Sequence, residues 1–244
     1  MTRAIEIEGL VRTYRSGLLR RASEVLRGVD LTLERGSTLG LVGPNGSGKT
    51  TLMRILAGMD AATSGRVRVL GASPFDAPVR RRVGFLPEDS PFPRELNGKE
   101  ALHLLGSLHG IDRGERRRRT AELLELVGLA PHARTTLGRY SRGMLRRFGL
   151  AQAWFLEPEL ILLDEPTAGL DAQGFDVLAT LMQRARDRST AVVIASHLAS
   201  DLTQHTAEVA LILDGRIARR GTPQELLAGG GLAELYRSAG GHAR

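Results

Sequence analysis

The chain has 244 residues, of which 42% are hydrophobic and 25% charged, and it contains no cysteine. This composition is ordinary for a globular protein, and it excludes disulfide bonds and thiolate metal sites. No apolar run approaches the roughly 18 residues that a membrane-spanning helix needs, and Met1-Thr2-Arg3 leads directly into a strand pattern rather than a signal peptide. We therefore expect a soluble protein of the cytosolic type.

The formal net charge is +7, and nearly all of the basic residues are arginine, because lysine occurs only at Lys49 and Lys99. A genome rich in G and C produces such a bias without any functional cause, and we favour this interpretation. The excess positive charge also suits an anionic partner, either a membrane surface or nucleic acid.

The first part of the chain predicts antiparallel strands followed by a glycine-rich loop. Residues 4–11 and 25–33 alternate apolar and polar side chains, as strands do, and a basic loop at 16–23 separates them. An apolar run at 39–42 leads into the loop, and a helical pattern follows it. The loop itself reads Gly43-Pro44-Asn45-Gly46-Ser47-Gly48-Lys49-Thr50-Thr51.

This loop fits the phosphate-loop pattern of Gly, four residues and Gly-Lys-Ser/Thr, in the strand–loop–helix context that the motif requires. Its glycines let successive N–H groups point at phosphate oxygens, and the start of the following helix adds positive charge. Lys49 can reach the β- and γ-phosphates, and the Thr50 hydroxyl can bind Mg²⁺. We therefore expect all nine loop residues, 43–51, to bind a nucleotide.

The middle of the chain predicts two strands and then a block of helices. Short strands are expected around 67–69 and at 81–86, the second ending at Pro87-Glu88. Helical spacing follows at 96–105, 115–127 and 143–155, and Pro158 prevents the last helix from continuing. We interpret the basic run Arg116–Arg119 as a solvated helix face rather than a binding patch. Because this block interrupts the alternation of strands and helices, it is predicted to be an inserted helical subdomain.

The last part of the chain returns to alternating strands and helices. The runs at 160–163 and 191–195 are continuously apolar, which is typical of strands buried on both faces, and an amphipathic helix at 172–186 separates them. A hairpin at 209–218 with an Asp-Gly turn and a short helix after Thr222 complete the pattern, and glycines at 229–231 and 240–241 predict flexible ends. The sequence thus predicts an α/β core with a mostly parallel sheet.

Two of these apolar strands end in polar residues that suit phosphate chemistry. Asp164 and Glu165 follow the strand at 160–163, and His197 follows the strand at 191–195. An aspartate at such a strand end can hold the metal shell, and the next carboxylate can act as general base toward an attacking water. His197 can donate a hydrogen bond to a γ-phosphate oxygen. In isolation, Asp-Glu-Pro is only a strand-to-turn transition, and the phosphate loop upstream favours the functional interpretation.

With these strand ends, the segment Tyr140-Ser141-Arg142-Gly143-Met144 makes the chain resemble the ATP-binding cassette (ABC) family over essentially its whole length. The resemblance implies an α/β, RecA-like P-loop NTPase core with an N-terminal antiparallel β subdomain and an inserted α-helical subdomain. It also implies a single domain over 1–244, with the helical subdomain at about 89–155 and a short helical tail at 220–244.

The resemblance assigns a role to each site residue. By it, residues 43–51 are the Walker A loop, Asp164 the Walker B aspartate, Glu165 the catalytic carboxylate and His197 the switch histidine. Tyr14 would stack on adenine, and Asp171 lies in the D-loop. Ser141 and Gly143 would contact the γ-phosphate of ATP bound to a second subunit. The implied cofactors are ATP and Mg²⁺, with Thr50, Glu88 and Asp164 as the metal-binding residues, Asp164 through a water.

The chain departs from the family pattern in two places. The signature motif, usually Leu-Ser-Gly-Gly-Gln, has Tyr140, Arg142 and Met144 at three positions, but the phosphate-contacting Ser141 and Gly143 are kept. We therefore expect both composite sites of a homodimer to be competent. Glu88 stands where the family has glutamine; it keeps an acceptor for Mg²⁺, loses the amide donors and adds negative charge.

The resemblance is strongest to the subunits that energise exporters whose membrane part is a separate polypeptide. We therefore expect an ATPase that dimerises head-to-tail with a second copy of itself or a related cassette, bound peripherally to a permease at the cytoplasmic face of the membrane. By the same resemblance, Asp89–Leu96 and the face at Leu102 and Leu105 are the expected contacts for that permease. One alternative is a soluble ABC ATPase acting on nucleic acid or ribosomes, supported only by the basic charge. Another is a nucleotide-gated regulatory protein that rarely turns over, against which the intact Lys49, Asp164, Glu165 and His197 argue.

Overall fold

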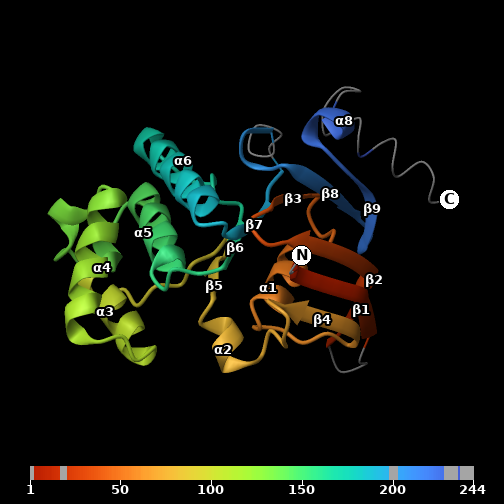
Figure 1. Ribbon diagram of the computed structural model, residues 1–244, viewed down its shortest axis with the longest axis horizontal. Helices are drawn as coiled ribbons and strands as arrows, with labels where there is room; N and C mark the ends of the chain where they lie inside the picture. The colour runs from red at the N-terminus through yellow and green to blue at the C-terminus, as the bar shows by residue number, and fades with distance from the viewer. Residues whose placement is uncertain (1–2, 17–20, 198–202, 228–235, 237–244) are drawn as a thin grey trace.

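The computed structural model describes residues 3–16, 21–197, 203–227 and 236. Two sheets and a set of helices make up this part of the chain. The helices α3 (Gly98–Leu108), α4 (Arg113–Leu126) and α5 (Arg142–Trp154) lie at the end of the molecule opposite the N-terminal strands (Figure 1). No helix in the described ranges is long and apolar enough to cross a membrane. The glycines at 229–231 and 240–241, predicted to mark flexible ends, lie outside the described residues.

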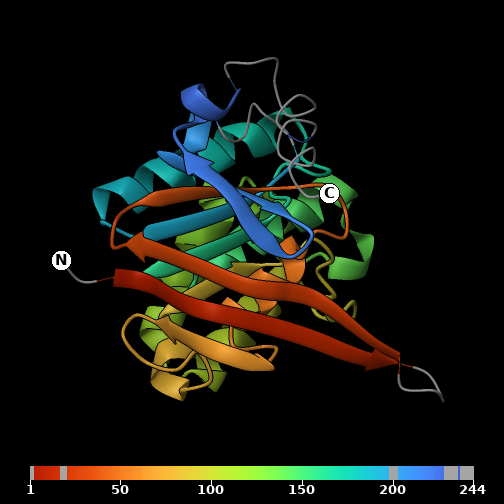
Figure 2. The ribbon, with the colours of Figure 1, turned by 90° about the vertical axis from the view of Figure 1, so that its right-hand side faces the viewer.

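The smaller sheet is antiparallel, with strand order β2-β1-β4, formed by β1 (Arg3–Ser16), β2 (Arg21–Glu34) and β4 (Ser64–Val69). Strands β1 and β2 form a long ribbon across one side of the molecule (Figure 2). They extend further than their alternation predicts, since Ser16 pairs with Arg21. Both ends of the predicted basic loop, Ser16 and residues 21–23, therefore belong to the strands, and its centre at 17–20 lies outside the described residues. Backbone pairing extends the ribbon where the side-chain pattern stops.

The larger sheet has six strands in the order β5-β6-β7-β3-β8-β9. Every pair in it is parallel except β8–β9, which confirms the predicted α/β core. The continuously apolar strands β6 and β7 are buried along their whole length, as expected for strands covered on both faces. The strand bounds are β3 Thr38–Val42, β5 Val83–Leu86, β6 Leu160–Asp164, β7 Ala191–Ala195, β8 Glu208–Leu213 and β9 Arg216–Gly221.

The order of the central strands explains how distant motifs meet. Strands β6, β7 and β3 are neighbours, and because they are parallel, their carboxyl ends share one edge of the sheet. The residues after β3, β6 and β7 are those of the phosphate loop, Glu165 and the turn at His197. Ligands of open α/β sheets bind at this edge.

The helices divide between the two faces of this sheet. Helix α1 (Lys49–Leu56) packs into a core shared by the two sheets, whereas α3, α5 and α6 pack on the other face in a second core that also contains residues of α4. The bounds of the remaining helices are α2 Ala77–Arg80, α3 Gly98–Leu108, α4 Arg113–Leu126, α5 Arg142–Trp154, α6 Ala172–Asp187 and α8 Pro223–Leu227, with short 3₁₀ turns at Ala130–His132 and Leu137–Arg139.

Helix starts are set by caps that hydrophobic spacing does not reveal. The Asn97 side chain accepts from the Glu100 N–H and the Glu100 carboxylate accepts from the Asn97 N–H, so α3 begins at Gly98. Asp112 accepts from the N–H groups of Gly114 and Glu115, so α4 begins before the predicted residue 115.

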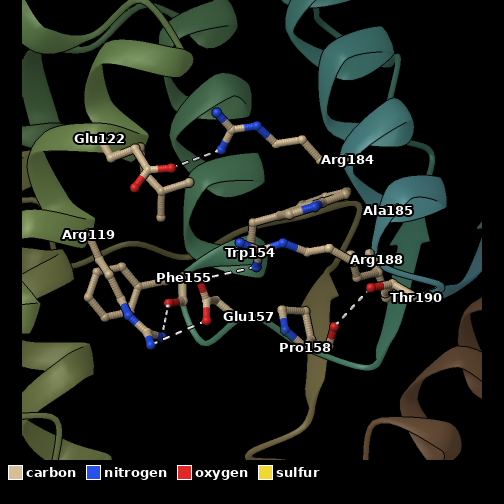
Figure 3. A pocket seen from close by; sticks show the side chains of 12 residues that line it. Arg119, Glu122, Trp154, Phe155, Glu157, Pro158, Arg184, Ala185, Arg188 and Thr190 are labelled. Atoms are coloured by element: carbon tan, nitrogen blue, oxygen red, sulfur yellow. Dashed lines mark hydrogen bonds and ion pairs between the residues drawn. The ribbon is translucent and has the colours of Figure 1, made fainter.

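Ion pairs join α4, α5 and α6 around a small cavity of about 40 Å³, into which Trp154 projects (Figure 3). Arg184 pairs with Glu122 at 3.1 Å, and Arg188 and Arg119 pair with Glu157 at 3.1 and 3.4 Å. The arginines of this cavity are thus neutralised by glutamates. Within the run at 116–119, Arg118 and Arg119 both pair with Glu115, as on a solvated helix face.

Candidate nucleotide-binding site

A cavity of about 450 Å³ lies at the carboxyl edge of the larger sheet. Residues from the loops after β3, β5, β6 and β7 line it, together with one residue of β2. The lining residues are Val25, Asn45, Gly46, Ser47, Gly48, Lys49, Thr50, Thr51, Glu88, Asp164, Glu165 and His197. The structure thus brings most of the sequence-predicted site residues together.

The backbone of the phosphate loop needs glycine at particular positions. Gly46 and Gly48 have φ of 79° and 108°, a region that L-residues rarely adopt. A Cβ at Gly43 would lie 2.3 Å from the Ile212 carbonyl oxygen, so that glycine lets the loop approach β8. Helix α1 starts at Lys49, directly after the loop, so its unpaired N–H groups face the cavity. The loop is shaped to bind an anion.

The Lys49 side chain lies over the phosphate loop that precedes it in the sequence. Its Nζ donates to the carbonyl oxygens of Gly43 at 2.7 Å and Pro44 at 3.3 Å. Burial lowers the pKa of Lys49, while the carboxylates of Glu165, Asp164 and Glu88 act in the opposite direction. The ammonium is thus placed between the loop and the acidic residues, where a phosphate group would meet it.

Asp164 presents a carboxylate suited to a metal shell. It is 1% exposed, and both of its oxygens are buried without a hydrogen bond of ordinary geometry. Burial raises its pKa, Glu88 and Glu165 raise it further, and the Thr50 hydroxyl and Lys49 partly oppose this. An orphaned buried carboxylate beside a threonine hydroxyl fits Mg²⁺, which prefers oxygen ligands.

The protein side chains alone make an incomplete metal site. Within the described ranges, no group of three or more His, Cys, Asp or Glu residues is placed to hold a metal ion. Mg²⁺ usually keeps several waters and binds through one or two protein groups together with substrate phosphates. The residues present therefore suit Mg²⁺ that arrives with a nucleotide.

Glu165 and His197 form a pair at the edge of the cavity. His197 Nδ1 lies 2.8 Å from Glu165 Oε2, and Glu165 is only 7% exposed. Glu165 has φ of 49°, unusual for a residue other than glycine, and its N–H donates to the Ala195 carbonyl at 2.8 Å. The strand end thus turns this carboxylate away from the strand direction, toward the histidine.

Ser141, Gly143 and Asp171 do not line this cavity. Ser141 caps α5, its hydroxyl accepting from the Met144 N–H at 3.2 Å, and Asp171 caps α6. A Cβ at Gly143 would lie 2.9 Å from Asp171 Oδ2, so the starts of the two helices touch. The variant Tyr140 is a core residue whose hydroxyl donates to the His132 carbonyl at 2.9 Å.

The aromatic residue Tyr14 is held by side chains outside this cavity. Its hydroxyl donates to Asp60, and the Arg12 guanidinium lies 4.3 Å from the ring centroid. Asp60 follows the far end of α1 from the phosphate loop, and Tyr14 does not line the cavity. The alternation of β1 points Arg12 and Tyr14 the same way, which favours this cation–π pair. Val25 occupies the cavity wall instead.

Sequence reasoning also missed Arg146, five residues after Ser141. Its guanidinium is buried and donates to backbone carbonyls beside Glu88 and Glu165. An arginine in an amphipathic helix is ordinarily expected to face solvent. The sequence signal that could have indicated burial of Arg146 is its position on the apolar side of α5.

A second surface lies beside the site, after β5. A cavity of about 140 Å³ is lined by nine residues of β5, the segment after it and α5. The sequence also suggested a face at Leu102 and Leu105 as a permease contact. That prediction is wrong for Leu102, which is fully buried, while Leu104 and Leu108 on the same helix are 49% and 75% exposed. The nine lining residues are Phe85, Leu86, Pro87, Ser90, Pro91, Phe92, Pro93, Gly149 and Gln152.

Comparisons with known proteins agree with this geometry. Residues 26–168 match the family model described as ABC transporter. An ABC transporter ATP-binding protein of Synechocystis sp. is 36% identical over 98% of this chain and 66% of its own length. The daunorubicin resistance ATP-binding protein DrrA3 of Streptomyces coeruleorubidus is 35% identical over 92% of this chain and 70% of its own. The chain thus spans about two thirds of the length of these relatives.

Solved structures extend the similarity to the fold. The ATP-binding subunit of an ABC transporter superposes with a TM-score of 0.83, at 26% identity over 97% of this chain and 99% of that one. The dimeric post-hydrolysis state of the ATP-binding cassette MJ0796, bound to ADP and Pi, has a TM-score of 0.81, at 25% identity over 90% of this chain and 98% of that one. The α/β, P-loop architecture with an antiparallel N-terminal sheet is common to all of them.

Proposed function

Because this chain belongs to the ABC transporter family and carries its ATPase domain, we propose that it binds and hydrolyses ATP as the nucleotide-binding subunit of an exporter. The observation that carries the proposal is the convergence of Lys49, Asp164, Glu165 and His197 on one cavity behind a phosphate loop. The roles of the individual residues are part of the proposal.

The loop N–H groups and the start of α1 bind the phosphates, and Lys49 exchanges its bonds to the loop carbonyls for bonds to phosphate oxygens. Thr50, Glu88 and Asp164 hold Mg²⁺, which supplies neutralisation of phosphate charge when it is bound. Glu165 orients a water toward the γ-phosphorus and accepts its proton. His197, oriented by Glu165, donates to a γ-phosphate oxygen and offsets developing charge.

A second cassette completes the site. Ser141 and Gly143 at the start of α5 lie away from the cavity of their own chain, so they serve the nucleotide of a partner in a head-to-tail dimer. The dimeric cassette MJ0796 bound to ADP and Pi supports this arrangement. ATP then favours the closed dimer because it binds that state more tightly, and hydrolysis releases it.

The permease of this proposal is a separate membrane protein that docks at the cavity after β5. Proline and phenylalanine residues line that cavity, and apolar surface of this kind suits a helix from a partner. Export is favoured because relatives include daunorubicin resistance and bacitracin transport ATP-binding proteins. By this proposal the chain is held at the cytoplasmic face of the membrane by its permease.

The test is the variant Glu165→Gln, which keeps the size of the side chain and its contact with His197 but cannot accept a proton. We expect it to bind ATP, to accumulate as a dimer in size-exclusion chromatography, and to lose about 10²–10⁴-fold in kcat. Glu157→Gln is the matched control, because Glu157 also has a positive φ of 51° but lies in the ion pairs among α4, α5 and α6. Near-normal turnover in Glu165→Gln would reject the general-base assignment.

The composite site has its own test. Ser141→Arg places a long cation where the partner's γ-phosphate would lie. ATP binding by the monomer should be kept and turnover abolished, measured by equilibrium binding and by phosphate release. Retained turnover would argue against a site shared between two chains.

A further inference from the structure

One buried arginine of α5 joins two turns that border the nucleotide cavity. Arg146 is 6% exposed. It donates to five backbone carbonyl oxygens, those of Pro87 at 2.7 Å, Glu88 at 3.1 Å, Asp164 at 2.5 Å, Glu165 at 2.5 Å and Pro166 at 3.3 Å.

These carbonyls belong to the ends of neighbouring strands. Residues 87–88 follow β5 and residues 164–166 end and follow β6, and β5 and β6 are paired. A buried carbonyl left without a donor destabilises the fold. The planar fork of a guanidinium carries five N–H donors and can serve both turns at once, whereas the single ammonium of lysine cannot span them.

Arg146 also secures an unusual backbone conformation. Glu165 has a φ of 49°, a strained conformation for a non-glycine residue that persists only where its surroundings fix it. Its N–H is bound by the Ala195 carbonyl and its own carbonyl by Arg146. The peptide on each side of the Glu165 side chain is therefore held, and so is the direction of its carboxylate.

The same residue lies on the helix that begins with the signature motif. Ser141 caps α5, and Arg146 follows within the next two turns. One turn further, Gly149 lies against β5, since a Cβ there would be 2.6 Å from Leu86 Cδ1. Helix α5 thus contacts both the end of β5 and the turn after β6.

We propose that Arg146 is a positioning residue that fixes Glu165 and ties the signature helix to the turns at 87–88 and 164–166. The consequence is that the direction of the Glu165 carboxylate depends on a contact made by the helix that Ser141 begins. This inference rests on the proposed function for its catalytic part. Its structural part, the tie itself, does not need turnover to be tested.

The first experiment measures amide hydrogen exchange in the full chain. Arg146→Gln should speed exchange in the turns at 87–90 and 165–168, because the carbonyls of residues 87–88 and 164–166 lose their donor, and leave the exchange of β3 unchanged. Arg146→Lys, which keeps the charge, should behave similarly and covers the case in which the glutamine variant fails to fold. Arg119→Gln is the matched control, because Arg119 donates to the Phe155 carbonyl at 3.3 Å from a different surface. Unchanged exchange at both turns would overturn the inference.

The second experiment measures ATP turnover. In Arg146→Gln we expect kcat to fall about 100-fold, as when a catalytic group such as the Glu165 carboxylate is misplaced by about 1 Å. The affinity of the monomer for ATP should stay unchanged. An unchanged kcat, or a fall in kcat matched by an equal loss of ATP affinity, would overturn the positioning of Glu165 by Arg146. Absence of turnover in the wild type would refute the proposed function, while the exchange result would still decide the role of Arg146.

Discussion

The contact between β5 and α5 can be tested with one added methyl group. Gly84 lies in β5, and its backbone φ is one that alanine can adopt. Any effect of Gly84→Ala therefore arises from steric overlap of the added methyl group and not from backbone strain. A Cβ there would lie 2.1 Å from the Ala153 carbonyl oxygen and 3.1 Å from Pro158 Cγ. Ordinary carbon–oxygen contacts begin at about 3.3 Å, so α5 must retreat by about 1 Å. Gly84→Ala should therefore affect both stability and the position of the signature helix.

The magnitude follows from overpacking. Inserting a methyl group into a packed interior costs about 1–3 kcal/mol. For a chain of this size each kcal/mol lowers Tm by about 2–4 °C, which predicts a loss of about 2–12 °C. A thermal melt followed by circular dichroism measures the stability, and phosphate release measures kcat, which should fall because α5 carries Ser141 and Arg146.

Gly114→Ala serves as the control, because it lies in the first turn of α4 and its nearest neighbour is the Asp112 side chain at 3.2 Å. It should be neutral or stabilise by up to about 1 kcal/mol. If Gly84→Ala melts and turns over like the wild type, the argument from close approach is refuted.

Two further predictions concern charge. Lys49→Ala should weaken ATP binding at least about 30-fold, since one charged partner of the phosphates is lost, and ATP should no longer raise Tm in a thermal-shift assay; an unchanged shift would reject the role of Lys49. Glu159 lies between Arg82 and Arg35, whose hydrogen bonds lower its pKa from 4.5 to about 2. Because the folded pKa is depressed, the contribution of this group is complete above pH 4.5 and lost as the pH falls toward 2. The wild type should melt slightly above Glu159→Gln at pH 7, modestly because the side chain is 39% exposed, and the two should converge near pH 2; a pH-independent gap would contradict this.

The core strands were predictable because burial on both faces requires apolar side chains along the whole strand. A strand covered on both faces, such as β6 or β7, must be continuously apolar, and the polar residue that ends it then marks the edge of the sheet. The phosphate loop, Asp164, Glu165 and His197 could be found in this way. Their meeting in one cavity follows from the parallel strand order.

Other features depend on partners that no local pattern specifies. The Arg146 side chain is paired with backbone carbonyls, which every residue has, so nothing in the sequence identifies them. Tyr14 is held by Asp60, which follows the end of α1, and by Arg12 two residues earlier on the same strand. Leu102 is buried because α3 packs with α4 and α5, and helical spacing alone does not say which of two apolar stripes faces the core.

The cavity among α4, α5 and α6 gives the protein an internal optical reporter. Trp154 is the only tryptophan in the sequence, and its ring lies among Arg184, Arg188 and Glu122 (Figure 3). It ends the helix that Ser141 begins, and the neighbouring helix begins after Asp171. Because the emission wavelength of indole depends on the charges around the ring, a tilt of α5 against α6 shifts the emission maximum of Trp154. The fluorescence of the unlabelled protein therefore reports movement of α5 against α6.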